Sequence, residues 1–119
     1  VLGGNVDDHN KNFSFLMDDD GHWHVAPTYD YTFSVDPDAP YYVNRHSMTI
    51  NNKTEGITAE DLLEVARRYG IKAAEPFIEK AIGIVSHYPE YGREAGVGEE
   101  WIGTIEKEIA ARVECVRAD

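Results

Sequence analysis

The chain is short of cysteine, of basic residues and of long apolar runs, and each shortage excludes a class of protein. Its one cysteine, Cys115, cannot form an internal disulfide, so we expect a reducing, cytoplasmic setting. No apolar run reaches membrane-spanning length and no basic-then-apolar leader is seen, so we expect neither a membrane anchor nor secretion. The net charge of −11 argues against direct binding of nucleic acid, because the phosphate backbone needs a basic surface.

The acidic residues are concentrated at the start of the chain. Residues 1–40 hold eight Asp and a single base, Lys11. We expect most of these Asp side chains to be solvated, although such a cluster is also typical of a divalent-cation site. With 119 residues, 42% of them hydrophobic, the chain suffices for one domain with a modest core, in which Trp23 and Trp101 are expected to anchor the packing.

A β-hairpin is predicted in the first third of the chain. Apolar and aromatic residues at 13–17 and 22–27 flank an Asp-Asp-Asp-Gly turn, in which Gly21 would supply the left-handed position. An EF-hand loop beginning at Asp18 is excluded, because its sixth position is Trp23 where glycine is required.

Helical patterns occupy residues 58–119, after an irregular connection over 41–57. Thr58 and Asp61 form a capping-box pattern at the first helix start. Two further helices are predicted, one beginning near Pro76 and the last over 99–116, and residues 89–97 are expected to form a short helix or a turn. The second helix carries an apolar stripe broad enough to be buried on most sides. The predicted fold class is therefore mainly α with a small β-hairpin.

The polar loop over residues 4–12 holds the residues that could carry chemistry. Phosphoryl transfer needs a carboxylate near the attacking hydroxyl and oxygen ligands for Mg²⁺ on the phosphates. Asp7 fits the first role, and Asn12, five residues later, fits the second. Asp30, just after the hairpin, would supply a further ligand. An Asp/Asn-rich loop by itself is most often turn chemistry, but the third residue in the expected place favours a site.

These segments resemble the HipA-like kinases, which are bacterial toxin kinases. The stretch Asn-Val-Asp-Asp-His-Asn-Lys-Asn-Phe-Ser at residues 5–14 is similar to their Asp-x-His-x-Lys-Asn-x-Ser catalytic loop. Ala-Pro-Thr-Tyr-Asp at 26–30 is similar to their Pro-x-Tyr-Asp metal segment, and residues 46–51 resemble a further family stretch. The resemblance covers essentially all of residues 1–119 and implies the C-terminal lobe of a protein-kinase-like fold. Residues 1–40 would hold the catalytic loop, the hairpin and the metal segment.

The resemblance implies a role for each matched residue. Asp7 would be the catalytic base toward a Ser or Thr hydroxyl. Asn12 and Asp30 would hold Mg²⁺ against the phosphates of ATP, the co-substrate. His9 and Lys11 would shape the catalytic loop, and Lys11 would also offset phosphate charge.

The resemblance also implies partners and a missing part. It implies a serine/threonine protein kinase that is the toxin of a toxin–antitoxin pair. The expected partner is a helix-turn-helix antitoxin, and DNA would be contacted only through that antitoxin. The expected substrate is a protein, such as an aminoacyl-tRNA synthetase. A kinase also needs a glycine-rich loop and a strand lysine for the phosphates, and the chain has neither. We therefore expect the C-terminal part of a longer kinase, inactive by itself. A small-molecule or lipid kinase and a non-catalytic helical interaction module remain open as alternatives.

Other polar residues have simpler interpretations. Asp8 matches no position of the family motif and receives no role. His22 and His24 share a face of the predicted hairpin, where zinc is conceivable, but no Cys or third His lies nearby in sequence, so an exposed strand face is favoured. The role of His46 is left open, with a hydrogen-bonded structural histidine as one interpretation.

Overall fold

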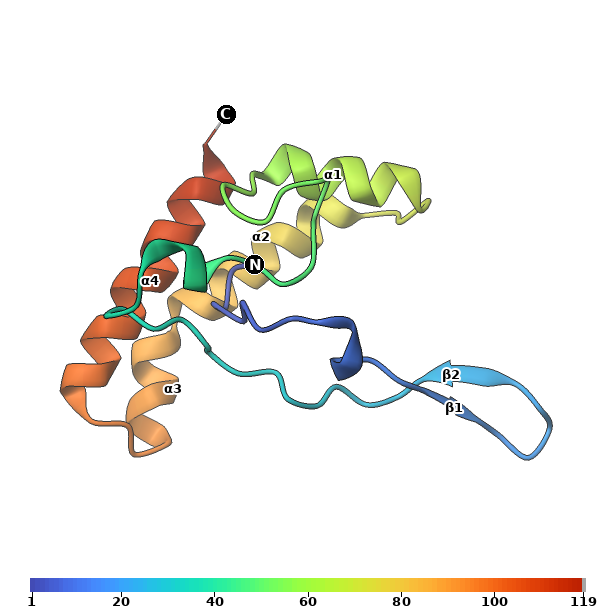
Figure 1. Ribbon diagram of the computed structural model, residues 1–119, viewed down its shortest axis with the longest axis horizontal. Helices are drawn as coiled ribbons and strands as arrows, with labels where there is room; N and C mark the ends of the chain where they lie inside the picture. Colours follow the sequence, from blue (N-terminus) through green and yellow to red (C-terminus); the bar gives the residue numbers. More distant parts are fainter. Residues whose placement is uncertain (119) are drawn as a thin grey trace.

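The computed structural model describes residues 1–118 and consists of a helical part from which a two-stranded hairpin extends (Figure 1). The predicted class, mainly α with a small hairpin, is confirmed. Its elements are β1 (Phe15–Met17), β2 (Trp23–Val25), α1 (Ala59–Arg68), α2 (Ala74–Ser86), α3 (Tyr88–Glu94) and α4 (Glu99–Arg117), with 3₁₀ turns at Asn10–Asn12 and Tyr41–Asn44. Among the described residues, no helix is both long and apolar enough to span a membrane.

The hairpin forms where the sequence predicts it. β1 and β2 pair antiparallel with Phe15 opposite Val25, and Gly21 takes the left-handed conformation at φ 83°. All six strand residues are exposed, so the hairpin buries little of its own apolar surface. The expectation that Trp23 anchors the packing is wrong, because 67% of this residue is exposed, and Trp101 is likewise 57% exposed.

The first helix begins with the predicted capping box. The Thr58 hydroxyl accepts a hydrogen bond from the Asp61 backbone N–H, and the Asp61 carboxylate accepts one from the Thr58 backbone N–H. This buried carboxylate also accepts hydrogen bonds from Lys53 Nζ at 2.8 Å and Asn51 Nδ2 at 2.9 Å. Asp61 therefore ties the irregular connection to α1.

The core lies between α2 and α4, beside α1. Its buried members are apolar residues of the two longer helices, namely Ile78, Ile82, Ile109, Val113 and Val116. The last helix, predicted over 99–116, is confirmed as α4. The prediction that α2 is buried on most sides is wrong, because Phe77 and Ile84 are 71% and 50% exposed and only Ile78 and Ile82 are buried. The helix packs along one narrow stripe, and the rest of its apolar surface is open.

The two isoleucines of α2 provide a matched test of this packing. Ile82 is 3% exposed and Ile84 is 50% exposed on the same helix. We expect Ile82→Ala to lower the free energy of unfolding by about 2–5 kcal/mol, because the lost methyl groups leave a cavity. Ile84→Ala should change it by less than about 1 kcal/mol. Denaturant unfolding measures both, and equal losses would contradict the assigned core.

Asp61 should make stability depend on pH in the acidic range. The hydrogen bond and ion pair from Lys53, followed by the hydrogen bonds from Thr58 and Asn51, lower the Asp61 pKa from its ordinary 3.8. A lowered folded-state pKa stabilises the fold fully above the unfolded value, and the contribution is lost as pH falls below about 4. The stability difference between the protein and Asp61→Asn should therefore be constant near neutral pH and shrink below about pH 4. A difference that grows on acidification would contradict the assignment, and Asp19→Asn, at the exposed hairpin turn, is the control.

Candidate functional site

The polar loop that follows Gly4 ends in a single 3₁₀ turn, and this turn brings Asn12 back onto Asp7. The Asn12 Nδ2 group donates a hydrogen bond to the Asp7 carbonyl oxygen at 3.2 Å. Because the amide nitrogen is used in this bond, the Oδ1 atom of Asn12 is left as an acceptor or metal ligand. The Asp7 carboxylate itself is 66% exposed.

The irregular segment after Asp30 holds the first half of the loop. The Ser34 hydroxyl accepts hydrogen bonds from the backbone N–H groups of Val6 at 2.9 Å and Asp7 at 3.1 Å, and its own N–H donates to Gly4. Gly4 has φ 68°, and a Cβ there would lie 2.7 Å from the Phe33 ring. Only glycine lets the two segments approach this closely.

A second contact joins the loop to the proposed metal segment. The Tyr29 hydroxyl donates a hydrogen bond to the Lys11 carbonyl oxygen at 3.0 Å. Asp30, the next residue, is exposed and has φ 54°. A left-handed conformation is uncommon for a residue other than glycine, but Asp and Asn adopt it more readily than most, so it does not by itself mark a functional site. Apart from the motif itself, nothing in the sequence predicted the hydrogen bonds that Ser34 and Tyr29 make to the loop.

Asn12 and both neighbours of Asp30 face a common cleft of about 290 Å³. The cleft is lined by Val1, Asn5, Asp8, Asn12, Phe13, Thr28, Tyr29 and Tyr31. The cleft brings Asn12, whose side chain carries an amide oxygen, together with the neighbours of Asp30, whereas Asp7 and Asp30 themselves are not among its lining residues. Hard oxygen ligands of this type suit Mg²⁺. The metal role of Asn12 and Asp30 stays a prediction.

His9 and Lys11 occupy different surroundings. His9 Nε2 lies 3.8 Å from Asp7 Oδ1, and its other ring nitrogen is buried without a hydrogen-bond partner among residues 1–118. The ring thus lies beside the carboxylate that we expect to be the base. The Lys11 side chain is exposed, while its carbonyl group receives the Tyr29 hydroxyl. Their roles in shaping the loop also stay predictions.

The sequence analysis assigned no role to Asp8, yet its side chain makes three hydrogen bonds, more than any other side chain of the polar loop. Its Oδ1 atom accepts hydrogen bonds from the backbone N–H groups of Ser47 at 2.7 Å and Met48 at 3.2 Å. Its Oδ2 atom lies 2.7 Å from Nδ1 of the buried His46. The interpretation of His46 as a hydrogen-bonded structural histidine is therefore confirmed. No spacing rule could have found this pair, because the residues are 38 positions apart.

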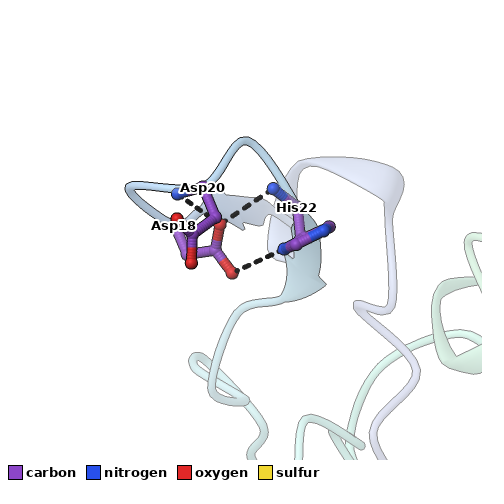
Figure 2. A group of neighbouring side chains, drawn as sticks. All are labelled: Asp18, Asp20 and His22. Carbon is purple, nitrogen blue, oxygen red and sulfur yellow. Dashed lines mark hydrogen bonds and ion pairs between the residues drawn. The ribbon is translucent and has the colours of Figure 1, made fainter.

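The hairpin turn also gathers residues of metal-ligand type. Asp18, Asp20 and His22 each place a ligand atom within 4.8 Å of the others (Figure 2). Asp18 Oδ1 accepts hydrogen bonds from the backbone N–H groups of Asp20 and His22, and Oδ2 lies 3.0 Å from His24 Nε2. The bond from His24 does most to lower the Asp18 pKa, followed by the His22 N–H. These bonds are ordinary turn chemistry and account for the grouping, so we assign no metal to it.

Comparisons with known proteins agree with the motif. A family profile described as HipA-like C-terminal domain matches residues 1–112. A search of curated proteins and a search of solved structures each return no match. The matched range takes in both the polar loop and the Asp30 segment, together with most of the helical part. The chain therefore belongs to the family of HipA-like C-terminal domains.

Proposed function

We propose that this domain supplies the catalytic base and the metal ligands of a serine/threonine protein kinase. The family assignment supports the relation to HipA-like proteins. The observation that carries the proposal is the pairing of the two polar segments: Tyr29 is bonded to the Lys11 carbonyl, and Asn12 shares one cleft with both neighbours of Asp30. These contacts support the proposal because they join the two segments that carry the proposed metal ligands.

Each polar residue has a defined task in this proposal. Mg²⁺ bound between Asn12 Oδ1 and the Asp30 carboxylate would position and neutralise the phosphates of ATP. The exposed Asp7 carboxylate would accept the proton of the attacking Ser or Thr hydroxyl. His9, beside Asp7, and the backbone of Lys11, under Tyr29, would keep the loop in shape.

The proposal extends to the protein that carries this domain. A glycine-rich loop and a strand lysine, which the chain lacks, would come from an N-terminal part of that protein. The partners proposed from the family are a helix-turn-helix antitoxin and a protein substrate, for which an aminoacyl-tRNA synthetase is the candidate. By itself, the 119-residue chain should bind Mg²⁺ weakly and transfer no phosphate.

Phosphoryl transfer by the longer protein is the test. We expect phosphoserine or phosphothreonine to form in a mixture of cell proteins given Mg-ATP, as measured by mass spectrometry. Asp7→Asn should lower the rate by roughly 10²- to 10⁴-fold, because a general base of this kind contributes that much. Asp30→Asn should lower the rate and raise the Mg²⁺ concentration that half-maximal transfer requires, and Asp19→Asn should change neither.

Two outcomes would contradict this account. Transfer that is equally fast with Asp7→Asn would exclude Asp7 as the base and favour the non-catalytic interaction module. Asp7-dependent transfer by the isolated 119-residue chain would show that no N-terminal part is needed.

A further inference from the structure

Two adjacent aspartates of the polar loop lie in opposite environments. The Asp7 side chain is 66% exposed, whereas the Asp8 side chain is 18% exposed and turned toward residues 46–48. Exposure suits a group that must meet a substrate hydroxyl. Burial with several hydrogen-bond donors suits a group that fixes the backbone.

The contact between the loop and residues 46–48 runs in both directions. The Asp8 carboxylate accepts from Ser47 N–H, Met48 N–H and His46 Nδ1. In return, the Val6 carbonyl accepts from both the N–H group and the hydroxyl of Ser47, at 3.0 and 3.2 Å. Residues 6 and 8 are thus bonded on each side of Asp7. Charge-assisted bonds to a carboxylate are among the stronger hydrogen bonds in proteins.

The protonation of His46 follows from its surroundings. Burial lowers the His46 pKa, and the hydrogen bond that the ring makes to the Asp8 carboxylate only partly opposes this. Burial would raise the Asp8 pKa, but the bonds from His46, Met48 and Ser47 outweigh it and lower the value. An ionised carboxylate only accepts, so the neutral ring must carry its proton on Nδ1 and leave Nε2 unprotonated.

The other ring nitrogen supports this tautomer. His46 Nε2 is buried with no hydrogen-bond partner among residues 1–118, and the residue lines a cavity of about 220 Å³. The Nδ1–Asp8 bond is therefore the contact that orients the ring. In metal sites and catalytic triads a carboxylate orients a functional histidine through a bond of this kind, and here the bond fixes the positions of both Asp8 and His46.

We propose that Asp8 and His46 are positioning residues, which hold the loop backbone so that the Asp7 carboxylate stays at the substrate hydroxyl. The inference rests on the function proposed for Asp7. The Ser34 hydroxyl accepts hydrogen bonds from the Val6 and Asp7 N–H groups, and the contact of Asp8 with His46 holds the next residue of the loop. The Asp7 side chain is free to meet a substrate while its backbone is fixed on both sides. A misplacement of about 1 Å can cost roughly 10² in rate.

Asp8→Asn is the discriminating variant. Its remaining oxygen can still accept from Ser47 and Met48, but its NH₂ group would face His46 Nδ1 and force the ring proton to Nε2. Long-range ¹⁵N–¹H NMR of the 119-residue chain should show protonated Nδ1 in the original protein and protonated Nε2 in the variant. Amide hydrogen exchange at Val6 and Asp7 should become faster, while exchange in α4 stays unchanged.

Activity of the longer protein gives the second readout. Asp8→Asn should lower kcat about 10- to 100-fold with little change in the KM for ATP. His46→Asn, which keeps an N–H donor near the position of Nδ1, should retain more activity than His46→Leu. Asp18→Asn is the matched control, because Asp18 also accepts two backbone N–H bonds and contacts histidine but lies at the hairpin turn, and its kcat should be unchanged.

The outcomes separate this inference from the proposed function. If Asp7→Asn abolishes transfer but Asp8→Asn and His46→Leu keep the original kcat, the positioning role is wrong and the catalytic one stands. If the original protein transfers no phosphate, the proposed function fails, and NMR alone decides whether Asp8 and His46 fix Asp7. An unchanged tautomer with unchanged exchange at Asp7 would overturn that as well.

Discussion

Three hydrogen-bond donors of residues 46–48 converge on the Asp8 carboxylate, and this contact joins the polar loop to the rest of the molecule. The segment that supplies the donors continues through the Lys53–Asp61 ion pair into α1 and the helical core. The loop therefore has a continuous connection to the packed helices, although few of its own residues are buried. Without the contact, the loop would keep its hydrogen bonds with Ser34, the Tyr29–Lys11 bond and the bonds from Ser47 to the Val6 carbonyl.

The loop divides its polar groups between support and exposure. Asp8 and the Asn12 amide nitrogen are used in internal hydrogen bonds, whereas the Asp7 carboxylate points to solvent and Asn12 Oδ1 is left to a ligand. Such a division is what a preorganised site requires, because the reacting groups must stay free while the backbone that carries them does not move. Asp30 has a left-handed backbone conformation, as do Asn51, Asn52 and Ala73 elsewhere among the described residues.

Local signals in the sequence predicted the secondary structure better than the packing. The hairpin turn at Gly21 and the capping box of Thr58 depend on neighbouring residues, and both form as predicted. The exposure of Phe77, Ile84 and Trp101 was not predicted, because an apolar stripe does not state which part of it meets another helix. That choice depends on where α4 passes α2.

In the candidate site, too, the features that depend on local sequence were predicted and those that depend on packing were not. The motif indicated Asp7, Asn12 and Asp30 because their chemistry follows from residue type and spacing along the chain. The supporting contacts of Asp8, Ser34 and Tyr29 join residues 18 to 40 positions apart, and they exist only after the chain has folded. A single sequence carries no pattern for such pairs.

The central claim is that Asn12 and Asp30 bind one metal ion. Relaxation enhancement by Mn²⁺, which accepts the same oxygen ligands as Mg²⁺, tests it in the 119-residue chain with ATP present. The amide resonances of Asn12 and Asp30 should broaden together at the lowest Mn²⁺ concentrations, and Asp30→Asn should remove the effect at both. Broadening centred on Asp18 and His22, with Asn12 and Asp30 unaffected, would contradict the account.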